Sequence, residues 1–423
     1  MQQENNARFI IKKSTDVGGE IAVRGAKNHA LKVLAATVLT DKTVKITNIP
    51  LIEDVRRKEE LLVSIGVEVK REKETVYVNA KNITTTKLDP QKSSTIRTSI
   101  VLAAALLSRF GKVSFYHPGG CVLGKRPVDI FLEGFKELGA DVSGDEEMIN
   151  LKAKGGRLKG GEFFFPRISV TATEALIIAS VLARGKTILK NCALEPEIIA
   201  LCNFLNKCGA KIKGVGTSEI QVRGVERLRG GETKIIPDRI EAATFLILGA
   251  LHKTKLKISK CDPSLIEALI NMLQKSGVKI EKNKNYVTSL PYKELGSNNI
   301  MTHEYPGFAT DYQPPYTVLM TQAQGISLIH EPIFDGRLFF TDNLSQMGAK
   351  IIMCDPHRIV VQGPTPLIGK KLASPDIRAG IALVLAGSIA EGETVIDNIY
   401  QIERGYADID TRLKGIGVEI ERN

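Results

Sequence analysis

The chain has 423 residues, of which 43% are hydrophobic and 25% charged, with six cysteines and no tryptophan. At roughly 100–200 residues per domain, this length predicts two or three domains with ample cores and excludes a disulfide-stapled miniprotein or a disordered tail. The formal net charge is +11, but acidic and basic residues are interspersed. The charge therefore forms no basic nucleic-acid tail, although an anionic partner is expected.

The apolar stretches are shorter than the roughly 18 residues of a membrane span. The first residues, MQQENNARF, have neither a basic start nor an apolar signal core, so we expect a cytoplasmic protein that binds no membrane. The six cysteines form no CxxC pair and no Cys/His metal spacing. We therefore expect separate, reduced thiols and neither a metal site nor a redox dithiol.

A short phrase recurs six times along the chain, at intervals of 68 to 73 residues. It reads IGVEV at Gly66, LGADV at Gly139, CGAKI at Gly209, SGVKI at Gly277, MGAKI at Gly348 and IGVEI at Gly417. Each phrase follows an amphipathic run and precedes a β-branched stretch. The glycine is therefore predicted to end a helix and lead into a strand.

Each repeat also contains a helical stretch that is apolar almost all round, followed by a short alternating strand. In chain order these stretches are residues 30–39, 98–108, 174–183, 242–251, 315–324 and 380–390, and the strands begin at Val44, Val113, Ile188, Leu256, Ile326 and Val395. All-round apolar helices belong in a core. We predict an α/β protein of six repeats of about 70 residues, three in each of two halves, with buried helices inside and strands outside.

Mostly charged residues stand just ahead of the six buried helices: Lys27 with Asn28, Arg97, Thr171, Asp238 with Arg239, Asp311, and Arg378. If the three helices of a half run in parallel, their amino-terminal ends converge on one face, where free N–H groups favour anions. The alternative is that these residues are only caps and first-turn charges.

The densest local signal is the segment HPGGCVLGKRPVDIF, which contains Cys121. Gly119 and Gly120 permit an irregular loop, and Pro127 suits the first turn of a helix. The basic neighbours Lys125 and Arg126 favour a thiolate, as expected for a reactive cysteine. The alternative is that Cys121 is a small buried hydrophobe.

Two other functional classes fit the sequence less well. Gly119 to Lys125 matches the front of a phosphate-binding loop, but Arg126 stands where such loops need a Ser or Thr for magnesium, so an NTPase is not expected. The basic balance also allows nucleic-acid binding, yet aromatic residues are only 5% and no RNA- or DNA-binding phrase is present. We therefore expect no nucleic-acid partner.

The chain resembles the enolpyruvyl transferase family, specifically its UDP-N-acetylglucosamine 1-carboxyvinyltransferases, over its whole length. The resemblance is carried by RGAKNHAL, PGGCVLGKRPVD, SVTATEAL, LEPEI, PDRIEAATF, YPGFATDYQ, IFDGRL, DIRAG and IERGY, in that order. It implies a two-domain inside-out α/β barrel with a substrate cleft between the domains. One domain would span residues 27–236, and the other residues 1–26 plus 237–423, with hinges near Gly25 and Pro237.

The resemblance also implies the reaction, which is transfer of the enolpyruvyl group of phosphoenolpyruvate to the 3-hydroxyl of UDP-N-acetylglucosamine, with release of phosphate. This is the first committed step of peptidoglycan synthesis. Cys121 is similar to the family's general acid, and Asp311 to the carboxylate that binds the hydroxyl and helps to deprotonate it. Lys27, Arg126 and Arg404 resemble the clamp on phosphoenolpyruvate, with Arg337 and Arg378 in support.

Further substrate contacts are implied in the same way. They are Asn28, Arg97, Arg126, Pro127, Val128, Asp129, Ile130, Arg167, Ile168, Ser169, Val170 and Ile333. Thr171 and Leu194 depart from residues common in the family and bear on nucleotide binding. No cofactor is expected, and the protein is expected to be a monomer. The alternatives are a shikimate-3-phosphate enolpyruvyl transferase, disfavoured because SSTIRTSI stands where that family has a GNAGTAMR-like phrase, and a non-catalytic paralogue.

Overall fold

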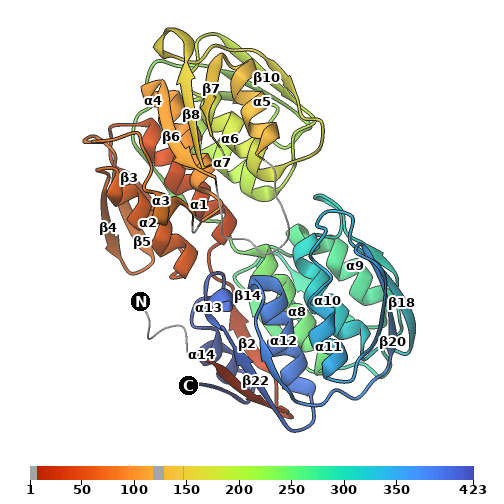
Figure 1. The fold of residues 1–423 in the computed structure, drawn as a ribbon. Helices are drawn as coiled ribbons and strands as arrows, with labels where there is room; N and C mark the ends of the chain where they lie inside the picture. The colour runs from red at the N-terminus through yellow and green to blue at the C-terminus, as the bar shows by residue number, and fades with distance from the viewer. Residues whose placement is uncertain (1–6, 95, 118–127, 146) are drawn as a thin grey trace. The chain divides into compact units, whose positions relative to one another are not determined.

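The structure is a computed structural model that describes residues 7–94, 96–117, 128–145 and 147–423 (Figure 1). These residues form two compact units. The terminal unit contains residues 7–24 and 237–423, and the central unit contains the described residues between 25 and 236. The chain passes from one unit to the other between residues 24 and 25 and again between residues 236 and 237.

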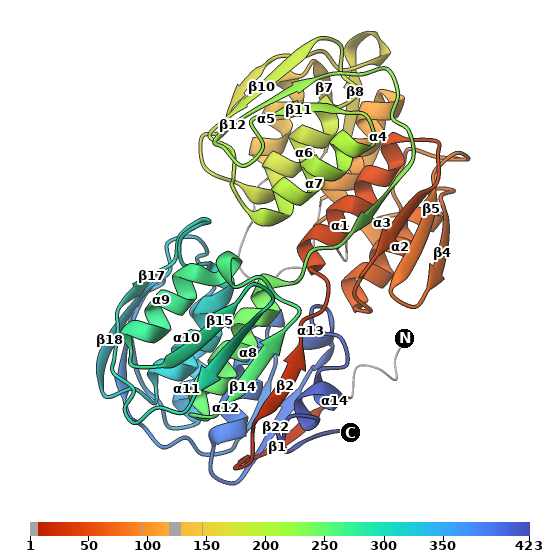
Figure 2. The ribbon, with the colours of Figure 1, turned by 180° about the vertical axis from the view of Figure 1, so that it is seen from behind.

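Three buried helices form the core of the central unit: α1 (Lys27–Ala36), α4 (Ser99–Phe110) and α6 (Val170–Ser180). Eight to ten residues of each helix are buried, because apolar side chains surround the axis. Less completely buried helices lie outside this core: α2 (Glu53–Ser64), α5 (Asp129–Glu137) and α7 (Pro196–Lys207), with the short α3 (Pro90–Ser94). The buried residues of these helices confirm the predicted pairing of a buried with an amphipathic helix. Figure 2 shows where the helices lie in the unit.

The strands of the central unit form three sheets. Their bounds are β3 (Val44–Thr47), β4 (Glu68–Glu72), β5 (Thr75–Asn79), β6 (Lys112–Tyr116), β7 (Ala140–Gly144), β8 (Met148–Ala153), β9 (Glu162–Phe164), β10 (Lys186–Lys190), β11 (Lys211–Lys213), β12 (Glu219–Arg223) and β13 (Gly231–Lys234). The strand orders are β13-β3-β5-β4, β6-β8-β7 and β11-β12-β10-β9. In β3, β5 and β10 buried residues alternate with partly exposed ones, so one face of each strand packs on the core.

The terminal unit repeats this plan. Its buried helices are α8 (Arg239–Leu251), α10 (Gln313–Met320) and α12 (Ile377–Ile389), and its outer helices are α9 (Glu267–Lys275), α11 (Thr341–Gln346), α13 (Tyr400–Glu403) and α14 (Ile409–Lys414). Its strands are β1 (Phe9–Lys12), β2 (Gly19–Ala22), β14 (Leu256–Ser259), β15 (Lys279–Asn283), β16 (Tyr286–Leu290), β17 (Ile300–Met301), β18 (Gly325–His330), β19 (Lys350–Asp355), β20 (Arg358–Gly363), β21 (Lys371–Ala373), β22 (Glu393–Asp397) and β23 (Ile420–Arg422). The sheets are β15-β16-β14-β2, β17-β18-β20-β19 and β21-β22-β1-β23.

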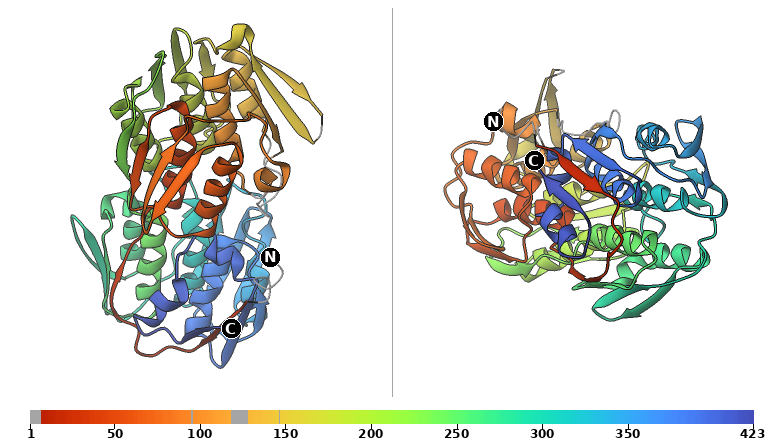
Figure 3. Two further views of the ribbon diagram at one scale, coloured as in Figure 1. Left: turned by 90° about the vertical axis from the view of Figure 1, so that its left-hand side faces the viewer. Right: turned by 90° about the horizontal axis from the view of Figure 1, so that it is seen from below.

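The five four-stranded sheets among the described residues share one pairing pattern, with one parallel pair followed by two antiparallel pairs. In the three-stranded sheet, a single parallel bridge between Lys87 and Ser114 takes the place of the parallel strand found in the other sheets. The amino-terminal β1 completes a carboxy-terminal sheet, since Phe9 lies opposite both Ile396 and Arg422 (Figure 3). The last repeat therefore closes only when both ends of the chain are present.

The six repeat glycines end helices as predicted. All have positive φ, between 83° and 103°, a region that glycine enters without a Cβ penalty. At five of them the next residue donates its N–H to the carbonyl five residues back, as Val67 does to Leu62 at 3.1 Å. This is the Schellman arrangement, which satisfies helix-end carbonyls and turns the chain into the following strand.

Candidate functional site

Helix starts position the charged residues of the terminal unit. Asp311 lies in a single helical turn, η5 (Thr310–Tyr312), directly ahead of α10. Arg378 is the second residue of α12, and the Asp376 carboxylate caps that helix by accepting the N–H of Arg378 at 2.8 Å. Arg239 begins α8, which Asp238 caps in the same way. Local capping chemistry thus fixes the backbone from which these side chains extend.

Asp311 lies between two arginines. The Arg378 Nε donates to Asp311 Oδ1 at 2.8 Å, and Arg337 Nη2 is 3.7 Å from the same oxygen. The side chains of Arg337 and Arg378 are only 3% and 7% exposed, whereas that of Asp311 is 25% exposed. The structure therefore brings together three predicted site residues, and the carboxylate is the member most accessible to a substrate.

The two arginines determine the ionisation of Asp311. Burial by itself raises the pKa of this carboxyl, but the charges of Arg378 and Arg337 and the hydrogen bond from Arg378 outweigh it and hold the pKa well below its usual range. For Arg378, burial lowers the pKa and the facing Asp311 raises it above its usual range. Asp311 and Arg378 are consequently both charged at neutral pH.

Arg337 has unused donors. Among the described residues its Nε and Nη1 are buried and have no hydrogen-bond partner, and Nη1 is 3.9 Å from Asp376 Oδ1. A buried guanidinium with unpaired N–H groups is costly unless a ligand completes its bonds. A carboxylate or phosphate matches that need, because guanidinium presents paired donors to such groups.

Tyrosines connect the starts of the three buried helices of this unit. The Tyr406 hydroxyl accepts from Arg378 Nη1 at 3.3 Å and lies 2.9 Å from Thr244 Oγ1 in α8. The Arg239 Nη1 donates to the Tyr312 hydroxyl at 3.0 Å, which joins α8 to the turn before α10. The predicted convergence of helix starts is therefore confirmed in the terminal unit.

Two further predicted residues, Arg404 and Ile333, also belong to this unit. Arg404 is partly buried, and its Nη1 donates to Gln401 Oε1 at 3.0 Å. A Cβ on the next residue, Gly405, would lie 3.9 Å from Arg378 Nη1, so this backbone passes beside the Arg378 guanidinium. The Ile333 backbone N–H donates to Glu331 Oε1 at 3.0 Å, and the residue is partly buried.

In the central unit Lys27 begins α1 and pairs with the second helix of the repeat. Its Nζ is 3.3 Å from Asp54 Oδ2, and the two side chains are 12% and 7% exposed. Asn28 follows as a partly buried residue of the same first turn, and Arg97 lies two residues before α4. These three predicted residues thus stand at helix starts.

A second set of charges lies deeper in this unit. Lys32 Nζ is 3.0 Å from Glu174 Oε2, with side chains 5% and 0% exposed, and Lys58 Nζ donates to the Thr98 carbonyl at 2.8 Å. Burial raises the pKa of Glu174 to about 7, although Lys32 opposes the shift. Burial also lowers the pKa of Lys58 to about 7, with Lys32 adding to the effect. Desolvation therefore prevails over pairing in this cluster.

The remaining described residues of the predicted site lie around the starts of α5 and α6. Val128 precedes α5, Asp129 opens it and lies 3.6 Å from Arg167 Nη2, and the Ile130 side chain is buried. Ser169 caps α6 by accepting the Ala172 N–H at 3.4 Å, with Ile168 before it and Val170 as the first helical residue. Cys121, Arg126 and Pro127 lie outside the residues that the structure describes.

The sequence matches known proteins over nearly its full length. Residues 11–413 match the family model described as EPSP synthase (3-phosphoshikimate 1-carboxyvinyltransferase). The chain is 41% identical over 419 residues to the UDP-N-acetylglucosamine 1-carboxyvinyltransferase of Koribacter versatilis (strain Ellin345), covering 98% of this chain and 96% of the relative. The protein of the same name from Solibacter usitatus (strain Ellin6076) is 41% identical over 416 residues, which cover 98% and 99% of the two chains.

The chain belongs to the UDP-N-acetylglucosamine 1-carboxyvinyltransferase family. Solved structures place the fold of this family member among enolpyruvyl transferases. NikO from Streptomyces tendae has a TM-score of 0.89 at 23% identity, with 99% of both chains covered. EPSP synthase from Acinetobacter baumannii has a TM-score of 0.76 at 17% identity, with 99% of this chain and 100% of the other covered. The mixed α/β architecture predicted from the repeat is thus the fold of an enzyme family.

Several residues that lie next to the predicted site residues were not themselves predicted from the sequence. Asp54 and Lys58 lie four residues apart in the charged run EDVRRKEE, which reads as a solvated helix face, yet they are 5% and 0% exposed. Their i,i+4 spacing on one face was the available signal. Tyr406 closes the phrase IERGY but was assigned no role, and Glu331 lies outside every phrase that carries the resemblance. Both contact residues far away in the sequence.

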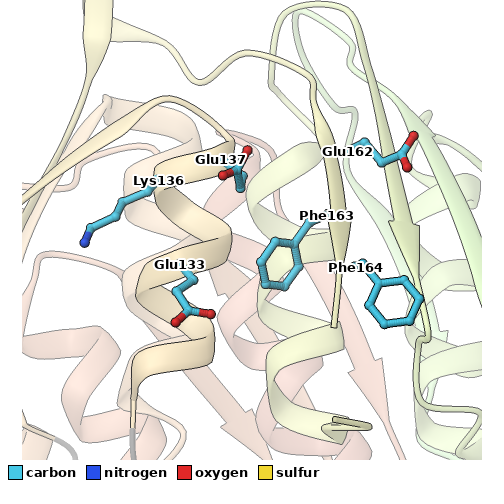
Figure 4. Close-up of a pocket in the computed structure, with 6 residues that line it drawn as sticks. All are labelled: Glu133, Lys136, Glu137, Glu162, Phe163 and Phe164. Atoms are coloured by element: carbon cyan, nitrogen blue, oxygen red, sulfur yellow. The ribbon is translucent and has the colours of Figure 1, made fainter. Parts of the chain in front are cut away.

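Two pockets of the central unit are lined by residues that do not belong to the predicted site. One, of about 350 Å³, lies between α5 and β9 (Figure 4) and is lined by Glu133, Lys136, Glu137, Glu162, Phe163 and Phe164. The other, of about 850 Å³, includes Arg109 and Arg157, whose guanidinium groups donate to backbone carbonyls near the ends of buried helices. Within the described ranges, no His, Cys, Asp or Glu cluster could hold a metal ion, and no helix is long and apolar enough to span a membrane.

Proposed function

We propose that this chain transfers the enolpyruvyl group of phosphoenolpyruvate to the 3-hydroxyl of UDP-N-acetylglucosamine and releases phosphate. The likeness to relatives of that name, about 40% identical over almost the entire chain, carries the proposal. The grouping of Asp311 with Arg337 and Arg378 supports it, because the substrates bring a phosphate, a carboxylate and a hydroxyl. The product would enter peptidoglycan synthesis.

The geometry around Asp311 suggests how the proton of the sugar hydroxyl is handled. A carboxylate paired with two arginines is ionised and accepts a hydrogen bond, but it is a weak base. When the anionic groups of phosphoenolpyruvate engage Arg337 and Arg378, they offset the positive charge facing Asp311. The pKa of Asp311 then rises, so the carboxylate becomes a better proton acceptor once both substrates are bound.

The other chemical roles are proposed from the resemblance. Cys121 would deliver a proton to the methylene carbon of phosphoenolpyruvate, and Lys27, Arg126 and Arg404 would hold its phosphate and carboxylate. Lys27 has a suitable setting, since it stands at the start of α1 with its amine near Asp54. Asn28, Arg97, Val128 to Ile130, Arg167 to Val170 and Ile333 would contact the sugar nucleotide. No residue role requires a cofactor.

We further propose that the two units are the two domains of an inside-out α/β barrel protein, each built from three repeats. Supporting this, each unit has three buried helices and three sheets among its described residues. The cytoplasmic location, the monomeric state and the lack of nucleic-acid or membrane partners stay predictions of the sequence.

Phosphate release tests the proposed reaction directly. The full chain is incubated with phosphoenolpyruvate and either UDP-N-acetylglucosamine or shikimate 3-phosphate. Stoichiometric phosphate with the nucleotide sugar alone is expected. Release with shikimate 3-phosphate alone would select the alternative acceptor, and none with either would leave a non-catalytic paralogue.

Thiol chemistry tests the role of Cys121. Exposure to the epoxide fosfomycin should give one adduct, on Cys121, by mass spectrometry. Four other thiols, Cys192, Cys202, Cys208 and Cys261, are buried, with pKa values raised by burial to about 11 or 12, and so hold little thiolate. The exposed Cys354 is the internal control. An unmodified Cys121 under turnover conditions would count against its assigned role.

A further inference from the structure

A buried carboxylate beside the Asp311 turn has no role in the chemistry above. Glu331 follows β18 directly and is fully buried. Its Oε2 accepts a hydrogen bond from Thr310 Oγ1 at 2.7 Å, and its Oε1 accepts the backbone N–H groups of Ile333 at 3.0 Å and Phe334 at 3.2 Å. Three donors from two chain segments thus compensate a charge that burial would otherwise make costly.

These bonds belong to a closed circuit that passes through the candidate site. Phe334 accepts the Arg337 N–H at its carbonyl, at 3.2 Å, and the Arg337 guanidinium reaches Asp311 at 3.7 Å. Asp311 is the chain neighbour of Thr310, which returns to Glu331. The segment that carries Ile333 and Arg337 is therefore joined to the Asp311 turn at two points. One link passes through Glu331, and the other is the contact between Arg337 and Asp311.

The backbone of Glu331 is held as well. Its N–H donates to the His357 carbonyl at 2.7 Å, and its own carbonyl lies 2.8 Å from His357 Nδ1, which must be the donor because a carbonyl only accepts. The backbone of Glu331 is therefore anchored to the turn between β19 and β20, while its carboxylate is held by the three donors described above. A fixed acceptor between two segments fixes the distance between them.

We propose that Glu331 is a positioning residue, which couples the turn carrying Asp311 to the segment carrying Ile333 and Arg337 so that both engage one sugar nucleotide. The inference rests on the proposed function, because it assigns the acceptor hydroxyl to Asp311 and a sugar-nucleotide contact to Ile333. Glu331 itself touches no substrate. Its effect passes through the hydrogen bonds to Thr310, Ile333 and Phe334.

Three variants separate positioning from bulk stability. Thr310→Val removes the hydroxyl that bonds Glu331 and keeps the side-chain shape, Glu331→Ala removes the carboxylate, and Glu331→Gln keeps an acceptor oxygen for the two backbone N–H groups. The matched control is Thr321→Val. Thr321 lies in the same unit and is fully buried, whereas Thr310 is partly buried, and it also donates at 2.7 Å, but to the Val318 carbonyl in α10.

Steady-state kinetics gives the first readout. A hydrogen bond to a charged group is worth roughly 10- to 100-fold, so Thr310→Val and Glu331→Ala should lower kcat/KM for UDP-N-acetylglucosamine by that factor. Glu331→Ala should raise KM as well as lower kcat, and Glu331→Gln should recover to within about threefold of the wild type. Thr321→Val should match the wild type. Wild-type kinetics in Thr310→Val, or a Glu331→Gln variant as impaired as Glu331→Ala, would overturn the positioning role.

Hydrogen exchange gives a second readout that does not depend on turnover. Thr310→Val should speed amide exchange in the peptide spanning residues 331–337, a different segment from the mutated one, whereas Thr321→Val should not. Unchanged exchange there overturns the coupling. If the wild type turns over neither acceptor, the proposed function fails, and the exchange experiment still decides whether Glu331 joins the two segments.

Discussion

The two units hold their buried charges in opposite ways. In the terminal unit Asp311 faces Arg337 and Arg378, and pairing prevails over burial, so the pKa values of Asp311 and Arg378 move away from neutrality. In the central unit burial prevails, and the pKa values of Glu174 and Lys58 both move to about 7. One cluster is fixed in its charged state near neutral pH, while the other changes its charge there.

The difference has a structural origin. Asp311 receives a short hydrogen bond from Arg378 and is one-quarter exposed, so solvent and partner both favour its charge. Lys58 is fully buried, and its amine is bonded to the Thr98 carbonyl, which is a neutral acceptor. A neutral partner compensates a buried charge less than a carboxylate does. Glu174 is fully buried, and burial outweighs even its charged partner Lys32. The balance between burial and pairing therefore decides whether a group serves as a fixed charge or as a titrating one.

Neutralising the fixed charge should give the largest effect. Asp311→Asn keeps the shape and one acceptor oxygen, but it cannot take a proton and removes the negative charge that faces both Arg378 and Arg337. We expect kcat for enolpyruvyl transfer to fall about 10³-fold, within the range for loss of a general base. The measurement is phosphate release at saturating substrates. Asp342→Asn, at an exposed aspartate in α11, is the control and should retain full activity.

Much of the fold was predictable, because the repeat is local. All-round apolar stretches, capping glycines and strand alternation each follow from neighbouring residues, and the helices and Schellman turns appear where those patterns place them. The convergence of Arg239, Asp311 and Arg378 in the terminal unit also followed, since equivalent repeat positions meet when helices pack in parallel.

The rest of the candidate site was less predictable because its contacts are long-range. Arg337 reached the predicted site only through the family resemblance, since no period relates it to Asp311. Glu331 and Tyr406 meet their partners through loops whose paths depend on tertiary packing. Lys58 looked like a surface charge, because composition shows the polarity of a helix face but not what covers it.

The titrating cluster gives an intermediate effect, visible as pH dependence. The folded-state pKa of Lys58 is lowered to about 7 from 10.5, so between these values the unfolded chain binds more protons and stability rises with pH. Below pH 7 Lys58 is protonated in both the folded and the unfolded state, so the cost of burying its charge is fully present. At about 1.4 kcal/mol per pKa unit, the full rise over this range is on the order of 5 kcal/mol.

Lys58→Met tests this directly. The variant lacks the titrating amine, so the stability difference between it and the wild type should shrink as the pH rises from 7 to 10. Urea unfolding followed by circular dichroism at several pH values measures that difference, with the exposed Lys42 replaced as Lys42→Met for comparison. A difference that does not change across this range would mean that Lys58 is charged in the folded state.

The smallest expected effect comes from replacing the repeat glycine by alanine at the same repeat position in each of the two units. Gly209 and Gly417 both end helices, with φ of +103° and +91°. A Cβ at Gly209 meets nothing nearer than Arg229 Nε at 3.8 Å, so Gly209→Ala should cost only the left-handed backbone, about 1 kcal/mol. A Cβ at Gly417 would lie 2.3 Å from the Asp16 carbonyl oxygen, so Gly417→Ala must also move the backbone and should cost roughly 1–3 kcal/mol more.

Hydrogen exchange in urea, followed on peptides from each unit, measures the two costs separately. Equal costs would mean that the segment around Asp16 yields freely, and that the joining of the two chain ends in the terminal unit is looser than its β1 pairing implies.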